Sequence, residues 1–223
     1  MHYEQIETGI FLERPNRFVA LVQFPDGRTE VVHVKNTGRC REILIPGCEV
    51  YLAYSGNEGR RTRYDLIAAV KNRDLLINID SQAPNVVMGE WLGKQDYTFI
   101  KPEYSYGGSR LDFYLERGSE KYLVEVKGCT LEIDGVGYFP DAPTLRGVKH
   151  LKELSQAVAQ GYHGVLAFVI QMEGVSEVRP NEKTHPEFAR VFREAEKAGV
   201  EIWFMLCRVE PADLHIISRV KKS

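Results

Sequence analysis

The segment from Tyr122 to Thr130, YLVEVKGCT, places one glutamate and one lysine two positions apart in an otherwise apolar run. Successive side chains of a strand point to opposite faces, so Glu125 and Lys127 share one face while Val124 and Val126 share the other. A carboxylate and an ammonium on one strand face can bind a metal ion and a phosphate oxygen. Neighbouring elements must supply the remaining groups of such a site.

A preceding strand, SRLDFYLE, is joined to this one by the turn RGSE. If residues 117–120 form a four-residue loop, Glu116 pairs with Lys121, and counting back sets Asp112 directly opposite Glu125. Side chains in such positions have Cβ atoms about 4.5–5.5 Å apart, where two like charges destabilise the pair unless they share a cation. The hairpin therefore predicts a site for Mg²⁺ or Mn²⁺, with the backbone carbonyl of Val126 as a further ligand.

Lys127 lies on the same face, where its ammonium can hold a phosphate oxygen or lower the pKa of an attacking water. Asp112, Glu125 and Lys127 would then form the catalytic set of a phosphodiester-cleaving enzyme. The alternative is a charged ladder on a solvated hairpin face, with Lys127 neutralising Glu125.

The first eighty residues show short β-type runs separated by turn residues, namely FVALVQF, TEVVHV, EVYLAYSGN and YDLIAAV. Their number and length predict an OB-like five-stranded barrel, a common nucleic-acid platform. We place this OB-like nucleic-acid-binding domain at residues 1–80.

From residue 81 to 223 the pattern becomes mixed α/β. A helix is expected in 144–161, with Thr144 as its N-cap and Gly161 at its end. The apolar run 164–172 predicts a buried strand, and the helix-like run 185–200 leads into a strand at 201–209. This is a βαβ crossover, which predicts a parallel pair of strands within a nuclease-like metal-binding domain.

The hairpin and its flanking elements resemble the PD-(D/E)xK nucleases, which include restriction endonucleases. Asp112, Glu125 and Lys127 match the motif, although Leu111 stands where many members have proline. The resemblance implies an α-β-β-β-α-β core with a mixed sheet over residues 83–171, metal ligation by the two carboxylates and assistance to the attacking water by the lysine. It also implies that Glu90, in the preceding helix, joins the metal ligands.

The whole chain resembles the sugar fermentation stimulation protein family through segments between residues 11 and 172. These segments are FLERPNRFVA, NTGRC, NIDSQAPN, EVKGCT, FPDAPT, RGVKHLKEL and FVIQM. That family is regarded as DNA-binding and is linked to sugar use. The resemblance therefore implies a DNA-binding regulator as an alternative to a nuclease.

A formal charge of −2 gives no overall attraction to nucleic acid, so DNA would have to meet local basic groups. The candidates lie in the barrel and at the start of the helix after the hairpin. They are Arg14, Arg17, Arg60, Arg61, Arg63, Lys149 and Lys152. Arg60, Arg61 and Arg63 have a plainer interpretation as an exposed turn, and the two lysines have one as a solvated helix face.

The sequence thus predicts a DNA-binding protein with a Mg²⁺-dependent deoxyribonuclease site. The alternatives are a non-catalytic regulator of sugar-utilisation genes and a metal enzyme acting on a small phosphoester. Four cysteines without zinc-site spacing, the polar N-terminus and the lack of a long apolar run predict a cytoplasmic protein without a membrane span. A homodimer would allow two sites to cut two strands.

Overall fold

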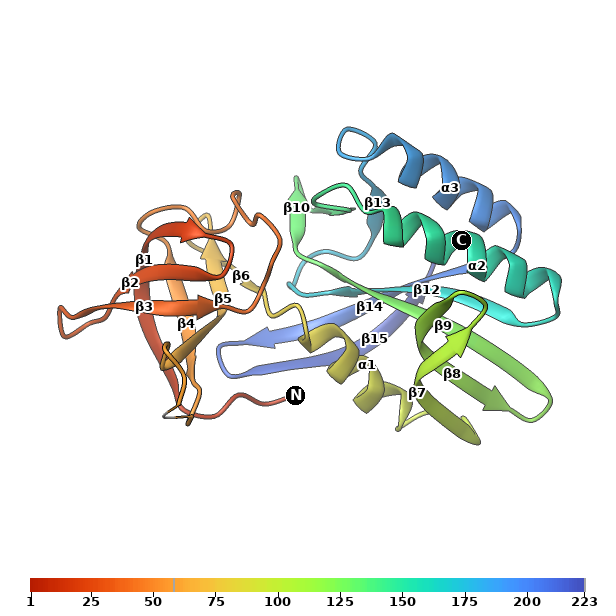
Figure 1. Cartoon of the computed structure of the whole chain (residues 1–223), viewed down its shortest axis with the longest axis horizontal. Coiled ribbons are helices and arrows are strands. Elements are labelled where there is room, and N and C mark those ends of the chain that lie inside the picture. Colours follow the sequence, from red (N-terminus) through yellow and green to blue (C-terminus); the bar gives the residue numbers. More distant parts are fainter. Residues whose placement is uncertain (58, 223) are drawn as a thin grey trace.

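The N-terminal part of the chain is a β-barrel (Figure 1). The computed structural model describes residues 1–57 and 59–222. The strand order is β3-β2-β1-β4-β5-β6, and a further pairing of β3 with β5 closes five of these strands into a barrel, as expected. The strands are β1 (Ile6–Asn16), β2 (Val19–Gln23), β3 (Thr29–Val34), β4 (Glu49–Tyr54), β5 (Tyr64–Lys71) and β6 (Leu75–Asn78).

Alternation of side chains explains how these short strands make a core. Ala20 and Val22 of β2 are fully buried, as are Val50 and Leu52 of β4, and the residues between them are partly exposed. The period of two is that of a strand with one face on a core. Register shifts along β1 let it curve while it pairs with both β2 and β4.

The second part of the chain is a six-stranded mixed sheet flanked by helices (Figure 1). Its order is β15-β14-β12-β9-β8-β7, and β9, β12 and β14 run parallel. The strands are β7 (Phe99–Tyr106), β8 (Ser109–Arg117), β9 (Glu120–Cys129), β12 (His163–Ile170), β14 (Glu201–Glu210) and β15 (Asp213–Lys221). Among the residues described, no helix is long and apolar enough to cross a membrane.

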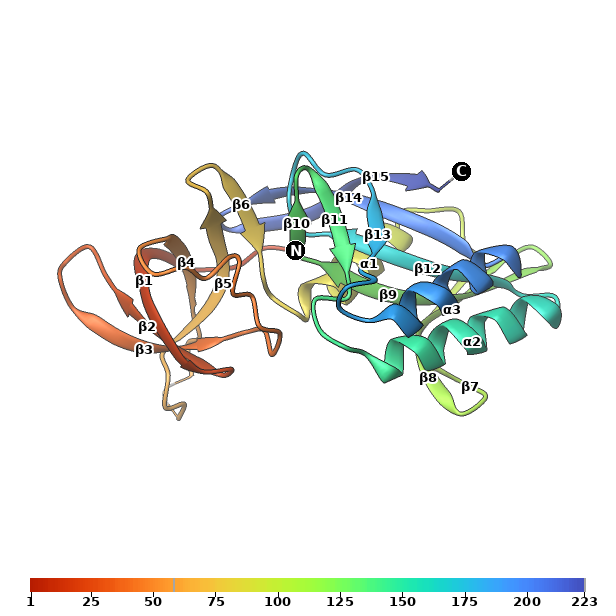
Figure 2. The ribbon, with the colours of Figure 1, turned by 90° about the horizontal axis from the view of Figure 1, so that it is seen from above.

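Helices cover both faces of this sheet (Figures 1 and 2). α1 (Ala83–Leu92) packs against alternate strand residues such as Val124, Val126 and Trp203. α2 (Leu145–Ala159) and α3 (Pro186–Lys197) pack on the other face, with Leu123 and Phe168. The even-numbered residues of β9 therefore face α1 and the odd-numbered ones, which include Glu125, face α2.

Local signals place the ends of α2 as expected. The Thr144 hydroxyl accepts a hydrogen bond from the Gly147 N–H at 3.0 Å, as an N-cap side chain should. Gly161 follows the helix with φ of +88°, a left-handed conformation that favours glycine. The helix therefore presents one fixed face to the sheet.

The hairpin turn differs from the expected four-residue loop. Strands β8 and β9 extend to Arg117 and Glu120, so Gly118 and Ser119 alone form the loop, with Gly118 at φ of +60°. Two-residue loops match the twist of paired strands, which explains why pairing continues into the turn. The expected register is unchanged because Glu116 still pairs with Lys121.

A small three-stranded sheet lies outside the expected elements. It contains β10 (Leu131–Ile133), β11 (Val136–Phe139) and β13 (Val178–Pro180). Strands of three or four residues are too short to show a period. In the chain, β10 and β11 lie between β9 and α2, whereas β13 follows β12. The small sheet packs beside the barrel, where β5 ends.

A buried polar network joins the barrel to the sheet. Asp80 has no exposed surface, and its carboxylate forms an ion pair with Lys35 Nζ at 2.9 Å and accepts a hydrogen bond from the Tyr3 hydroxyl at 3.1 Å. The Gln171 amide donates to the carbonyls of Asn78 and Asp80. The segment between the two parts is thus fixed by side chains from both.

Candidate metal and phosphate site

The hairpin brings the expected charged residues to one place. The cross-strand pairs of β8 and β9 run from Arg117 with Glu120 back to Phe113 with Val124. Asp112 and Glu125 occupy the next position along each strand. There the two strands separate, and the Asp112 carboxylate accepts the Val126 N–H at 2.7 Å. The side chain of Asp112 therefore replaces a strand carbonyl at the point where β8 separates from β9, which stays paired with β12 as far as Cys129.

Asp112 is half-buried and is held by two donors. Its second oxygen accepts a hydrogen bond from the Asn85 amide of α1 at 2.8 Å. Burial, followed by the nearby negative charge of Glu125, raises the pKa of Asp112, although the Val126 N–H and Lys127 oppose that rise. A positive charge placed beside Asp112 would relieve both unfavourable effects.

Glu125 is 1% exposed and faces α2. One of its oxygens, Oε1, accepts hydrogen bonds from both Lys127 Nζ and His150 Nδ1. Burial alone would raise the pKa of Glu125, but the His150 hydrogen bond and the Lys127 charge outweigh burial and lower it. Glu125 is therefore held as a carboxylate.

The other oxygen, Glu125 Oε2, is buried and has no hydrogen-bond partner among the described residues. A buried carboxylate oxygen without a partner is costly, and a cation is one way to satisfy it. Among residues 1–57 and 59–222, no group of three or more His, Cys, Asp or Glu side chains is arranged to hold a metal. Two carboxylates suit Mg²⁺, which commonly takes one or two and keeps several waters.

Glu90 lies elsewhere on α1. Its carboxylate accepts the N-terminal ammonium of Met1 at 2.7 Å. Asn85, five residues earlier, is the α1 side chain that contacts Asp112, and five residues correspond to about 140° around a helix. Glu90 therefore lies on a different face of α1 from Asn85, the residue that contacts Asp112.

Sequence reasoning missed three polar residues around the hairpin: Asn85, His150 and Gln171. Asn85 follows Pro84 in the first turn of α1, and His150 lies on the buried side of α2 with Leu151 and Leu154. A histidine on an apolar helical face was the available signal. Nothing in the strand pattern indicated which partner it would find.

The basic candidates divide into paired and unpaired groups. Arg60 forms an ion pair with Asp65 at 2.6 Å, and Arg63 forms one with Glu30 at 2.8 Å. On α2, Lys149 donates to the Gly108 carbonyl at 2.6 Å, and Lys152 lies 3.8 Å from Glu187. Arg17 and Arg61 have no ion pair with any residue that the structure describes.

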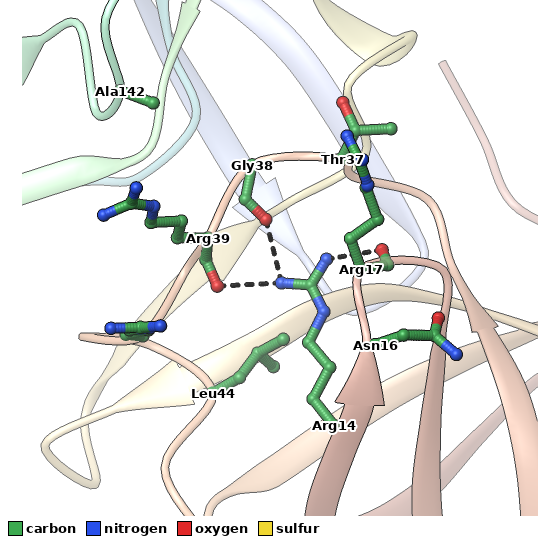
Figure 3. Close-up of a pocket in the computed structure, with 9 residues that line it drawn as sticks. Arg14, Asn16, Arg17, Thr37, Gly38, Arg39, Leu44 and Ala142 are labelled. Atoms are coloured by element: carbon green, nitrogen blue, oxygen red, sulfur yellow. Dashed lines mark hydrogen bonds between the residues drawn. The ribbon is translucent and has the colours of Figure 1, made fainter.

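Arg14 has a structural role instead of a free guanidinium. Its terminal nitrogens donate to the carbonyls of Arg17 at 2.7 Å, Gly38 at 2.9 Å and Arg39 at 2.8 Å (Figure 3). A fourth bond goes to the carbonyl of Asn36 at 2.7 Å. These bonds tie the end of β1 to the loop that follows β3. Arg14 thus fixes a surface that other arginines occupy.

Comparison with known proteins covers both parts of the chain. Residues 12–79 match the family model described as the SfsA N-terminal OB domain, and residues 82–213 match that described as the sugar fermentation stimulation protein RE domain. The solved structure of Pyrococcus furiosus SfsA in complex with Ca²⁺ superposes with a TM-score of 0.84 at 30% identity. The similarity covers 99% of this chain and 96% of that one.

Curated relatives are similar over nearly their whole length. A sugar fermentation stimulation protein homolog of Desulfitobacterium hafniense (strain DSM 10664 / DCB-2) is 54% identical over 212 residues, which cover 94% of this chain and 92% of the relative. One from Ruminiclostridium cellulolyticum is 47% identical over 225 residues, which cover 99% of each. The chain belongs to the sugar fermentation stimulation protein family.

Proposed function

We propose that this protein is a divalent-metal-dependent phosphodiesterase that cleaves DNA. The observation that carries the proposal is the buried, unpartnered Oε2 of Glu125 beside Asp112 and Lys127 on one hairpin. A structural ion ladder would satisfy both carboxylate oxygens. A site that accepts a cation from outside the chain would leave one available.

In this proposal Asp112 and Glu125 hold Mg²⁺ or Mn²⁺, with the Val126 carbonyl as a further ligand. The Asp112 side chain already contacts the Val126 N–H, so the backbone of β9 lies beside the carboxylates. A bound metal would supply Lewis acidity and a water of lowered pKa. His150 keeps the Glu125 carboxylate ionised and oriented from the α2 side.

Lys127 supplies positive charge at the same place. Its side chain is 18% exposed while that of Glu125 is 1% exposed, so the ammonium lies at the solvent side of the pair. From there it donates to a phosphate oxygen and stabilises the charge that develops on the phosphate during attack. In this proposal Lys127 lies between the buried carboxylate and the substrate.

Two further observations support the proposal. The order α1-β7-β8-β9-α2-β12 is the α-β-β-β-α-β order of the PD-(D/E)xK nucleases, with β10 and β11 inserted before α2. The Pyrococcus furiosus relative was solved with Ca²⁺, a hard cation that takes oxygen ligands as Mg²⁺ does. Ca²⁺ binding in a relative supports divalent metal binding here.

The test is cleavage of labelled single-stranded, duplex and branched DNA in Mg²⁺, Mn²⁺ or EDTA. Wild type is compared with Asp112→Asn, Lys127→Ala and the control Lys121→Ala, which changes an exposed lysine of the same strand. We expect metal-dependent cutting that is reduced at least a hundredfold in the first two variants and unchanged in the third.

Binding is measured in the same samples by retention of labelled DNA. DNA binding without cutting in either metal would overturn the nuclease and leave a DNA-binding regulator. Cutting of a small phosphodiester with no salt-dependent DNA binding would indicate a small-molecule substrate, because counterion release accompanies polyphosphate binding.

A further inference from the structure

A basic hollow opens on the barrel beside the loop that follows β3. It has a volume of about 510 Å³ and is lined by arginines 14, 17, 39 and 41 together with Thr37, Gly38 and Ala142 (Figure 3). Arg39 and Arg41 belong to the loop, whereas Arg14 and Arg17 flank the end of β1. Residues distant in the sequence thus converge on one concave surface.

The hollow is held in shape from within. The four carbonyl contacts of Arg14 draw the backbone of both segments inward. Asn36 adds two bonds, since its Oδ1 accepts the Gly38 N–H at 2.6 Å and its Nδ2 donates to the Ile79 carbonyl at 2.8 Å. Carbonyl oxygens that would repel an anion are therefore occupied by donors.

The other three arginines of the hollow are exposed, so their guanidinium groups can contact a ligand. Arg17, Arg39 and Arg41 form no ion pair with any described residue, whereas Arg28, Arg60 and Arg63 of the same barrel each pair with a carboxylate. Three unpaired guanidiniums around one concavity give a local positive field in a chain whose formal charge is −2. This charge is complementary to a polyanion.

The hollow continues into a cleft whose lining includes residues that are next to candidate-site residues in the chain. Thr37, Gly38 and Ala142 line both the hollow and a second cavity of about 350 Å³. The lining of that cavity also includes Pro84 and Gly128. Pro84 precedes Asn85, which holds Asp112, and Gly128 follows Lys127.

We propose that the hollow binds backbone phosphates of a nucleic-acid strand that extends from the Asp112–Glu125–Lys127 site, with Arg17, Arg39 and Arg41 as the phosphate-binding residues. This inference rests on the proposed function, because that proposal makes the Asp112–Glu125–Lys127 site the place where the strand is cut. A substrate that ends at the candidate site would miss these arginines. A longer strand gains them, so affinity grows with the length of the strand.

The test measures binding and not cutting. Fluorescence anisotropy of labelled single-stranded and duplex oligonucleotides of increasing length is recorded in EDTA over a range of salt concentrations. Arg39→Gln and Arg41→Gln are compared with Arg73→Gln, which changes an exposed arginine of the barrel that lies outside the hollow. For single strands each lost phosphate contact lowers the slope of log K against log salt by about 0.7.

We expect each hollow variant to lower that slope by about 0.7 and the double variant by about twice as much, with Arg73→Gln unchanged. The loss should appear for long oligonucleotides and vanish for the shortest. Equal slopes in all variants would overturn the inference. Displacement of a long oligonucleotide by inorganic phosphate at the same molar concentration would also overturn it, because a single-anion site would suffice.

These results separate the two proposals. Weaker binding by the arginine variants, with no cutting by wild type in any metal, would support the phosphate site in the hollow and contradict the proposed nuclease activity. Metal-dependent cutting, with oligonucleotide binding unchanged in the arginine variants, would support the nuclease activity and contradict phosphate binding in the hollow.

Discussion

At the scale of single residues, the chemistry of the site depends on how one buried carboxylate is held. Arg146 Nε lies 3.3 Å from His150 Nε2 and can donate to it, which leaves the proton on Nδ1 for donation to Glu125. Lys127 donates to the same oxygen of Glu125. Two donors on Oε1 keep Glu125 charged, while Oε2 has no donor among the described residues.

Replacing His150 by leucine should lower the free energy of unfolding by about 2 kcal/mol or more, because a buried carboxylate loses a donor. Urea denaturation at neutral pH measures the change. His215→Leu, at an exposed position on β15, is the control and should stay within about 0.5 kcal/mol of wild type.

A double-mutant cycle with Glu125→Gln tests whether His150 acts through that carboxylate. The His150→Leu substitution should cost less in the Glu125→Gln background, with a coupling of about 1 kcal/mol or more. Costs that simply add would show that His150 stabilises the fold independently of Glu125.

The site residues differ in how far the sequence reveals them. The proximity of Asp112, Glu125 and Lys127 could be predicted because strand alternation and hairpin register are local rules. The observed register agrees with the expected one up to Phe113 and Val124. His150 and Asn85 reach the site from helices on opposite faces of the sheet. Their partners depend on packing between elements, which no local pattern encodes.

At the scale of elements, the approach of α1 to β9 depends on a glycine. A Cβ added to Gly128 would lie 2.4 Å from Gln171 Oε1 and 2.8 Å from Pro84 Cγ. The absence of a side chain therefore lets the start of α1 and the end of β12 converge on β9. This convergence places Asn85 against Asp112.

The Gly128→Ala substitution should therefore destabilise the protein by about 1–3 kcal/mol, as overpacking of a filled site does. Gly93→Ala is a suitable control, since its added Cβ would come no closer than 3.5 Å to the Gly89 carbonyl oxygen and its φ is −63°. Thermal unfolding of the two variants compares them directly. An equally stable Gly128→Ala protein would mean that Pro84 and Gln171 move apart without cost.

Element prediction succeeded where periodicity was long and failed where it was short. The helix of residues 145–159 and the parallel pair β12 and β14 follow from apolar spacing over many residues. β15 was missed because most of its side chains are exposed, with Leu214 buried near its start. The exposure of its side chains reflects its position at the edge of the sheet, where it pairs only with β14 among the described strands.

At the scale of the whole molecule, the barrel and the sheet share one core. A single cluster of buried side chains includes Val50 and Leu52 of the barrel and also Leu166 and Phe168 of β12. The Asp80 network and the Lys71–Glu132 ion pair add polar contacts across the same boundary. We therefore expect the barrel and the sheet to unfold together in one cooperative transition.

The Lys71–Glu132 pair provides a pH-dependent test of that boundary. Lys71 ends β5 of the barrel, and its ammonium lies 2.5 Å from a carboxylate oxygen of Glu132 in β10. The hydrogen bond from Lys71, with a second from the Gly135 N–H, lowers the pKa of Glu132 below its ordinary value of about 4.5. The stabilisation is therefore complete above the unfolded pKa and is lost as the pH falls through the lower folded pKa.

Glu132→Gln should lower the free energy of unfolding by about 1–2 kcal/mol near neutral pH. The difference from wild type should shrink as the pH falls from about 5 toward about 3, because wild-type Glu132 then becomes protonated. Urea denaturation across this range measures the difference. The exposed Arg190–Glu194 pair within α3 gives the control Glu194→Gln, whose effect should stay below about 0.5 kcal/mol at every pH. A loss of unfolding free energy in Glu132→Gln that does not change with pH would contradict the proposed role of the ionised carboxylate. Two separate unfolding transitions would show that the barrel and the sheet unfold independently.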